Sequence, residues 1–182
     1  MALTATRNIA LILEDHEGRW ELHRGQLVER PGMSSSHNDV TLELVYHLRH
    51  QLPRDRYRVR VDGARLRRDE ESIYIPDIAV VPYDMAAPLM GKPRPPEIYT
   101  DPVLLVVEVW SPSTGEIDLK EKLPVYQRRG DLEIWHVHPF DRTLTAWRRQ
   151  PDGRYSKDVF RTGTVEPIGL PGVAIELEAL FD

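Results

Sequence analysis

The sequence predicts an α/β (α+β) domain in which helices flank a mixed β-sheet core, with an N-terminal hairpin and a β-rich C-terminal part. Two apolar runs, residues 72–81 and 103–109, predict the sheet core, because unbroken runs of this length are typical of strands buried on both faces. A helical pattern over residues 36–52 and alternating strands after residue 132 supply the other elements. This mixture of helices and strands favours a domain in which helical layers and sheet layers pack around one hydrophobic core.

The composition limits the structure and the function. The chain has 182 residues, so we expect a single domain over residues 1–182, with residues 1–17 as an N-terminal extension. Hydrophobic residues make up 41% and charged residues 29%, as in ordinary globular proteins, and no apolar stretch is long enough for a membrane span. The absence of cysteine excludes disulfides and thiolate chemistry, and the net charge of −5 argues against a chain coated in basic residues. Without a signal-peptide pattern, the expected compartment is the cytoplasm, with no membrane contact.

The first elements expected are a hairpin and a helix. Residues 20–29 form two short β-like segments around Arg24-Gly25, a turn in which glycine can adopt a positive φ. The serines at residues 34–36 offer an N-cap, and the helix that follows is expected to end before Pro53.

Each of the two apolar runs carries a single acid. The first contains Asp77 directly after Pro76, a residue that indicates a strand start, an edge or a bulge. The second has Glu108 near its end. A carboxylate at the end of a buried strand is costly unless a lysine, an arginine or a metal ion compensates for its charge. Two such acids on neighbouring strands would form a cation site.

The elements around the second apolar run are less regular. Residues 82–102 are rich in proline and are expected to form a long loop. After the run, Ser113 and Glu116 match a capping box, and a helix is expected to continue to Gly130. Pro124 should kink or shorten this helix. Strands are then expected over residues 132–137, 143–147 and 155–160.

Asp77, Glu108 and Lys122 are the sharpest candidate set for catalysis. Carboxylates are hard oxygen ligands suited to Mg²⁺ (or Mn²⁺), which often also binds substrate phosphate. Such a metal can polarise a phosphoryl oxygen and lower the pKa of a bound water. A lysine beside it could position or deprotonate that water, or balance the charge of the transition state. Lys122 shares a helix face with Asp118 and Tyr126, because the three are spaced four residues apart.

Several motifs occur in a characteristic order along nearly the whole chain. They are Ser34 with His37, Pro76-Asp77, the stretch from Glu108 to Thr114, the helical set Asp118, Lys122 and Tyr126, and finally Trp135 and Pro139. Over residues 18–181 this order resembles the PD-(D/E)XK nuclease superfamily and, more closely, the Uma-type (DUF820) family of restriction endonucleases. The resemblance implies a restriction-endonuclease-like fold and a nucleic acid, DNA above all, as the partner.

The resemblance also implies roles for individual residues. Two carboxylates would bind the metal, a lysine would be the catalytic cation and a histidine a nearby helper, which gives the catalytic set Asp77, Glu108, Lys122 and His37. In the superfamily the lysine usually lies two residues after the acid, where this chain has Trp110. In the Uma-type group the lysine lies in the next helix, which points to Lys122, with Lys120 as the alternative.

Structural roles are alternatives for the same residues. Asp77 could cap a turn or pair with an arginine, and Glu108 could form a buried ion pair with Lys122. Asp118 and Lys122 could be only a surface pair on one helix, and His37 only a helix-cap residue.

Three further side chains have a simple structural interpretation. Tyr126 and Trp135 are expected in the core. His136 and His138 point to the same face of one strand and could suggest zinc, but two ligands make an incomplete site.

The expected activity is therefore Mg²⁺-dependent hydrolysis of phosphodiester bonds in DNA by an endonuclease. The main alternative is a catalytically inactive nucleic-acid-binding or interaction protein on a nuclease scaffold, because a fold does not fix a function. A third hypothesis is that the protein is a small-molecule phosphoesterase. A homodimer would place two sites on a duplex, and two-fold dimers are the commonest oligomers.

Overall fold

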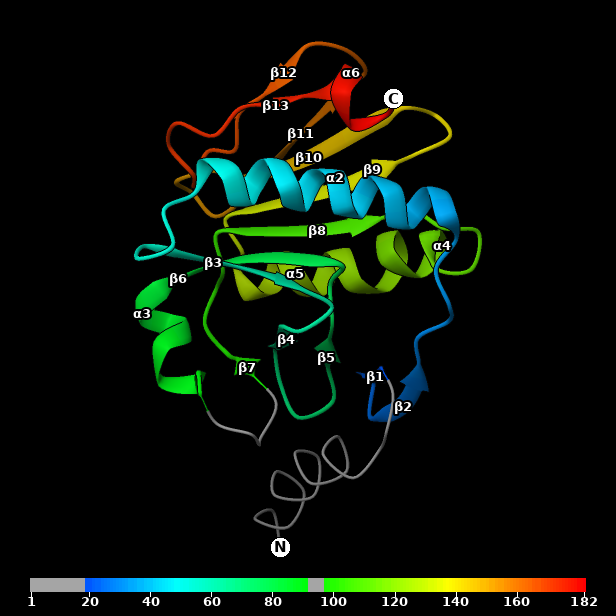
Figure 1. Cartoon of the computed structure of the whole chain (residues 1–182). Helices are drawn as coiled ribbons and strands as arrows, with labels where there is room; N and C mark the ends of the chain where they lie inside the picture. The colour runs from blue at the N-terminus through cyan, green and yellow to red at the C-terminus, as the bar shows by residue number, and fades with distance from the viewer. Residues whose placement is uncertain (1–18, 92–96) are drawn as a thin grey trace, which may run out of the picture.

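The protein, described by a computed structural model for residues 19–91 and 97–182, is built on a six-stranded mixed sheet (Figure 1). Its strand order is β11-β10-β9-β8-β6-β3, in which only β8 and β9 pair in parallel. The strands are β3 (Tyr57–Val61), β6 (Ile78–Pro82), β8 (Leu105–Val109), β9 (Glu133–His138), β10 (Thr143–Arg149) and β11 (Tyr155–Phe160).

Two smaller sheets accompany it. A five-stranded sheet has the order β2-β1-β5-β4-β7, and a two-stranded sheet pairs β12 with β13. Their strands are β1 (Trp20–His23), β2 (Gln26–Glu29), β4 (Arg65–Arg67), β5 (Ile73–Tyr74), β7 (Ile98–Tyr99), β12 (Thr164–Val165) and β13 (Ile175–Glu176). The mixed sheet with its flanking helices confirms the predicted fold class.

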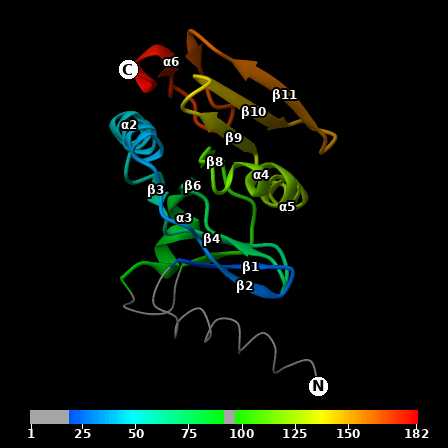
Figure 2. The ribbon, with the colours of Figure 1, turned by 90° about the vertical axis from the view of Figure 1, so that its right-hand side faces the viewer.

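Helices cover both faces of the six-stranded sheet (Figure 2). On one face α2 (Ser35–Gln51) and α6 (Leu177–Leu180) pack through a core that includes Leu44 and Val107. On the other face α4 (Gly115–Ile117), the π-helical turn η2 (Asp118–Lys122) and α5 (Leu123–Arg129) follow one another, and Tyr126 packs there near Val106. Because strand residues alternate between faces, Glu108 shares the face of Val106 and points towards η2 and α5.

Several local predictions are confirmed. The hairpin turn has Arg24 at φ 50° and Gly25 at φ 79°, the left-handed conformations of a type I′ turn. The N-cap of α2 is Ser34, whose side chain accepts a hydrogen bond from the backbone N–H of His37. Gly130 ends α5 in the left-handed conformation.

The run of residues 72–81 is two strands, whereas the sequence suggested one. β5 belongs to the smaller sheet and β6 to the larger, and they are separated at Pro76, which has no N–H to donate to a ladder. The backbone N–H of Ile75 instead bonds the carboxylate of Glu21. Asp77 therefore lies at the entrance to β6, where the chain passes from one sheet to the other.

The expected capping box at Ser113 and Glu116 is wrong. The N-cap is Thr114, without a side-chain cap bond, while the Ser113 hydroxyl lies 3.1 Å from that of Ser111. The effect of Pro124 is confirmed: the helix does not run straight to Gly130 but passes through η2, and Pro124 falls in the first turn of α5, directly after η2.

The proline-rich segment is more ordered than a loop. It contains α3 (Tyr83–Ala86), the 3₁₀ turn η1 (Ala87–Leu89) and β7. Residues 92–96 of this segment, like the expected N-terminal extension at residues 1–17, lie outside the described residues.

The turn into α4 depends on a glycine. A Cβ at Gly115 would lie 2.1 Å from Nε1 of Trp110, whose ring stacks on His138. We expect Gly115→Ala to destabilise the protein by about 2 kcal/mol, as overpacking does. Urea unfolding will measure this against Gly32→Ala, where no atom lies within 4 Å and little change is expected. Equal stability of the two variants would contradict this packing.

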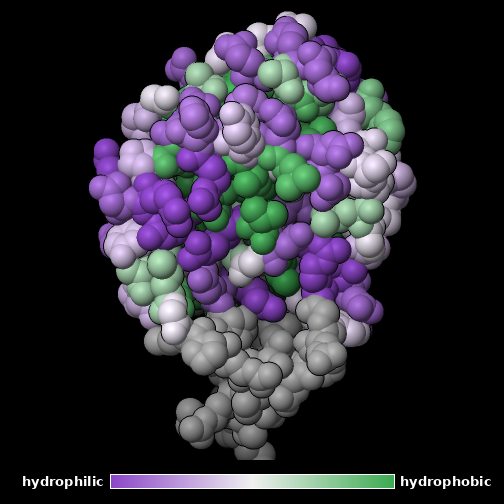
Figure 3. Space-filling model, in the orientation of Figure 1, coloured by the Kyte–Doolittle hydropathy of each residue, from purple (hydrophilic) through white to green (hydrophobic). Residues whose placement is uncertain are grey.

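The surface of the protein is mostly polar. The face that carries α2 is largely hydrophilic, with apolar side chains gathered near its middle (Figure 3). Across the described part of the chain, no helix combines the length and the apolarity needed to cross a membrane.

Candidate active site

Asp77 is held by three donors that come from separate parts of the chain. Its Oδ2 accepts from the backbone N–H of Val109 at 2.7 Å and lies 3.0 Å from Nε2 of His37, and its Oδ1 accepts from Arg30 at 2.6 Å. Burial alone would raise the pKa of Asp77, but the hydrogen bond of His37 and the charge of Arg30 lower it to about 2. Asp77 is therefore a firmly ionised carboxylate at neutral pH.

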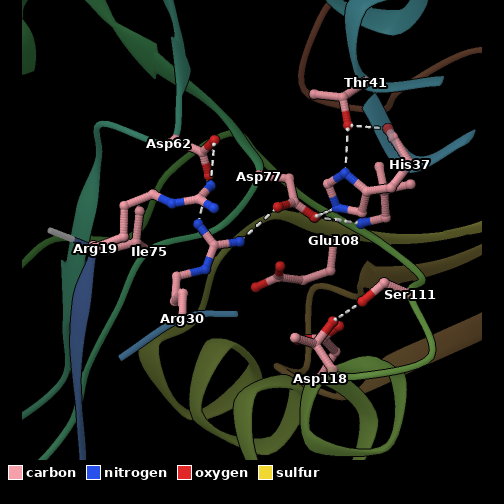
Figure 4. Close-up of polar contacts among 12 residues, drawn as sticks. Arg19, Arg30, His37, Thr41, Asp62, Ile75, Asp77, Glu108, Ser111 and Asp118 are labelled. Atoms are coloured by element: carbon pink, nitrogen blue, oxygen red, sulfur yellow. Dashed lines mark hydrogen bonds and ion pairs between the residues drawn. The ribbon is translucent and has the colours of Figure 1, made fainter. Parts of the chain in front are cut away.

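Glu108 faces Asp77 across two neighbouring strands. β6 and β8 pair antiparallel with Ile78 opposite Val107, and one further residue along this register sets Asp77 opposite Glu108. Opposed residues of an antiparallel pair direct their side chains to the same face. Figure 4 shows the two carboxylates and the guanidinium of Arg30 converging there. The sequence expectation of two acids on neighbouring strands is met.

Lys122 and Tyr126 reach Glu108 from the helical side. Tyr126 donates its hydroxyl to Oε1 of Glu108 at 2.6 Å, and Nζ of Lys122 lies 3.3 Å from the same oxygen. Burial raises the pKa of Glu108 well above its usual value, and the charges of Asp118 and Asp77 raise it further, against the opposing effect of Lys122. Protonation of Glu108 is thus easy compared with that of Asp77.

Lys122 is buried among three carboxylates. Its Nζ lies 3.0 Å from Glu21, 3.3 Å from Glu108 and 3.3 Å from Asp118. Burial would lower the pKa of Lys122, but these three acids together raise it above its usual value. Lys122 is therefore a permanent cation, suited to positioning a reactant and to balancing negative charge rather than to removing a proton.

The acids outnumber the cations in this region. We call the buried carboxylates Glu21, Asp77, Glu108 and Asp118, with Arg30 and Lys122, the buried charge cluster. With the histidines neutral and all four acids ionised, its described members carry an excess of two negative charges. Asp118 is buried as well, and the cation beside it is Lys122, 3.3 Å from its Oδ1, which also pairs with Glu21 and Glu108. One lysine shared among three carboxylates leaves part of their charge uncompensated, which favours either a further cation or a bound proton.

These residues fit a divalent cation in charge and in ligand type. Asp77 and Glu108 supply the hard oxygens that Mg²⁺ prefers, and a charge of +2 would balance the excess. Within residues 19–91 and 97–182, no group of three or more His, Asp or Glu side chains is arranged to hold an ion by itself. A Mg²⁺ site at Asp77 and Glu108 would therefore need water and substrate phosphate to complete its ligands.

Three site residues were missed or misassigned from the sequence. Glu21 and Arg30 come from the N-terminal hairpin and its end, and nothing in their local pattern distinguishes them from ordinary hairpin charges. Tyr126 is fully buried, as expected of a core residue, yet its hydroxyl binds Glu108. Its spacing from Lys122 on one helix face was the available signal.

The structure shows which of the purely structural roles expected for these residues are present. Asp77 does pair with an arginine, and Glu108 does pair with Lys122, so both ionic interpretations hold beside the proposed catalytic ones. The pair of Asp118 and Lys122 is buried and not on the surface. Lys120, the alternative lysine, is exposed and pairs with Glu116 at 2.7 Å, so it does not contact Glu108.

The two strand histidines do not form a common site. His136 is buried beside Glu108 in the register of β8 and β9, and burial lowers its pKa to about 4. The ring of His138 stacks on Trp110 at 4.3 Å. Among the described residues, neither histidine has enough neighbouring ligands for a zinc site.

The lowered pKa of Asp77 predicts a pH-dependent stability. An acid with a depressed pKa in the folded state stabilises the fold above its unfolded pKa, and this stabilisation is lost as the pH falls through the folded value. We expect Asp77→Asn to lose about 2 kcal/mol at neutral pH, and the difference from the wild type to vanish as the pH falls from about 4 to about 2. Urea unfolding over this range measures it, with the exposed Asp55→Asn as a control of little effect. A loss independent of pH would show that packing, not charge, is responsible.

A family model matches this chain in sequence, and a solved structure resembles it in fold. The model of the Uma2 family, described as "Putative restriction endonuclease", matches residues 8–180. Among solved structures, a protein of Anabaena variabilis ATCC 29413 described as a "putative nuclease belonging to DUF820" has a TM-score of 0.76 and 19% identity, with 97% of each chain covered. At this identity the likeness is one of fold. A search of the curated proteins found no match. The family model covers nearly the whole chain, and the chain belongs to the Uma2 family.

Proposed function

We propose that this protein is a Mg²⁺- or Mn²⁺-dependent endonuclease of the PD-(D/E)XK type that hydrolyses phosphodiester bonds, with DNA as its substrate. One observation supports it most directly: Asp77 and Glu108 oppose each other at a strand pair, inside a cluster that lacks two positive charges, with Lys122 in contact with Glu108. The description of the family as a restriction endonuclease agrees with it.

The residues of the chain would divide the work as follows. Asp77 and Glu108 would hold the metal ion, which polarises a phosphoryl oxygen and lowers the pKa of water when bound. Lys122, a permanent cation, would orient the attacking water and stabilise the negative charge that develops on the phosphate. His37 would hold Asp77 in place, since its Nε2 lies 3.0 Å from the Asp77 carboxylate. Tyr126 would fix the orientation of Glu108 through its hydroxyl.

A cleavage assay tests the proposal. Purified protein is incubated with supercoiled plasmid, linear duplex, single-stranded DNA and RNA in the presence of Mg²⁺, Mn²⁺ or EDTA. We expect nicking or cleavage of DNA with either metal and none with EDTA. Binding without cleavage under every metal condition would favour the inactive binding protein. Hydrolysis of mononucleotides or simple phosphate esters alone would favour a small-molecule phosphoesterase.

A further inference from the structure

Glu21 contacts both cations of the buried charge cluster, the single carboxylate of the described cluster to do so. Its Oε1 lies 3.0 Å from Nζ of Lys122 and 3.7 Å from Nε of Arg30. Asp77 contacts Arg30, and Glu108 contacts Lys122. Lys122 is therefore shared among Glu21, Glu108 and Asp118. Arg30 lies much closer to Asp77 and Asp62 than to Glu21.

The distances show which carboxylate Lys122 contacts most closely. Nζ of Lys122 is closer to Glu21, at 3.0 Å, than to Glu108, at 3.3 Å. The lysine therefore does not form its shortest contact with the proposed ligand. A lysine bound tightly to Glu108 would compete with a metal ion for the same oxygen, because both are cations and the oxygen is buried.

Glu21 itself is firmly anchored. Its Oε1 accepts from the backbone N–H of Ile75 at 2.8 Å, and its Oε2 lies 2.8 Å from Nε2 of His23. Ile75 precedes Asp77 by two residues, so this bond ties the hairpin strand β1 to the segment that carries a proposed ligand. Burial would raise the pKa of Glu21, but Lys122 and His23 lower it to about 2, so its charge is present at neutral pH.

We propose that Glu21 is a positioning residue of the cation site: its charge draws Lys122 partly away from Glu108 and leaves this carboxylate free to bind a divalent cation together with Asp77. This proposal rests on the proposed metal-dependent function. Without the charge of Glu21, Lys122 would move onto Glu108, and the excess negative charge of the cluster would fall from two to one.

Metal binding in the absence of substrate tests this role. Isothermal titration of Mn²⁺ into the full-length protein measures the affinity of the wild type and of Glu21→Gln, which keeps the shape of the side chain. We expect the affinity of Glu21→Gln to be weaker by about tenfold or more, because one charge near a divalent ion is lost and Lys122 moves onto Glu108. Glu21→Asp, which keeps the charge on a shorter side chain, should lie between the two.

A matched control separates this effect from the general loss of a charge. Glu121 is next to Lys122 in sequence and half-buried, and it lies 3.5 Å from His23. The ion pairs of Glu121 include neither Arg30 nor Lys122 in the described chain. Glu121→Gln should change the affinity for Mn²⁺ by less than about twofold, because solvent screens partly exposed charges.

The outcomes are distinct. If the wild type binds no Mn²⁺, the proposed metal-dependent function is overturned and this role with it. If the wild type binds Mn²⁺ and the folded Glu21→Gln protein binds it equally well, Glu21 is a structural residue only and the proposal is wrong. Circular dichroism and the melting temperature report folding. If Glu21→Gln does not fold, the affinity of Glu21→Asp for Mn²⁺ is the test instead. An affinity equal to that of the wild type would then overturn the proposal.

Discussion

Replacing Glu108 with glutamine should abolish DNA cleavage and still leave the protein at least as stable as the wild type. The loss of this proposed metal ligand is expected to lower the cleavage rate at least about a thousandfold, because metal stabilisation of the transition state amounts to several kcal/mol. The stability follows from the raised pKa of Glu108. An acid whose folded pKa is raised stabilises the fold only at low pH, and this contribution is lost as the pH rises through the folded value.

Urea unfolding at a series of pH values from 4.5, the ordinary pKa of a glutamate, upward measures this stability. The advantage of Glu108→Gln should grow with pH, since glutamine keeps the hydrogen bond of Tyr126 and leaves Lys122 with Glu21 and Asp118. A buried glutamate on the other face of the sheet provides the control. Glu133 accepts from Trp135, Arg148 and Ile168, in every case within 3.0 Å.

Glu133→Gln should therefore cost about 1–3 kcal/mol and retain cleavage, the opposite of Glu108→Gln. Full cleavage by Glu108→Gln would remove this residue from the catalytic set. A marked loss of stability in Glu108→Gln would show instead that its charge holds the fold together.

Replacing Lys122 with methionine should have the largest effect on stability. The change leaves Glu21, Glu108 and Asp118 buried without the cation that they share. Removing one member of a buried ion pair typically costs about 3–5 kcal/mol, because an uncompensated charge remains. We expect a loss of this size at neutral pH that shrinks as the pH falls and the carboxylates take up protons.

The neighbouring lysine is the natural comparison. Lys120 pairs with Glu116 at the surface, so Lys120→Met should change the free energy of unfolding by less than about 0.5 kcal/mol. Urea unfolding and cleavage assays of both variants distinguish the roles of the two lysines in stability and in catalysis. Normal cleavage by Lys122→Met together with a loss in Lys120→Met would transfer the catalytic role to Lys120.

The parts of the site that the sequence predicted are those encoded by short segments. Glu108 and Asp77 stand out because each is the single acid in an apolar run, and Lys122 follows from helical spacing. The contacts of Glu21 and Arg30 join residues that lie far apart in the chain: Glu21 meets Ile75, and Arg30 meets Asp77. No local pattern encodes such pairs, since they depend on how the smaller sheet meets the larger one.

The errors in the fold have the same origin. Residues 72–81 have one continuous β-like composition, but hydrogen bonding divides them between two sheets at Pro76. The capping box at Ser113 failed because the serine hydroxyl found a partner in Ser111, inside the turn. The conformational propensity of the residues identifies a strand or a helix in these places. Where that element begins is decided by the competition between local and distant hydrogen-bond partners.

The π-helical turn η2 absorbs one extra residue without disturbing the helix that follows it. The backbone N–H of Leu123 bonds the carbonyl of Asp118, so the turn holds one residue more than an ordinary α-turn. Deleting one residue inside the turn would regularise the backbone and leave Tyr126 nearly in its place, because the wide turn and an ordinary turn cover almost the same rotation. A deletion between Leu123 and Tyr126, in the regular helix, would instead rotate Tyr126 by about 100° around the helix axis, away from Glu108. Natural or designed variants of this protein should therefore tolerate the loss of one residue in η2 better than the loss of one residue in α5.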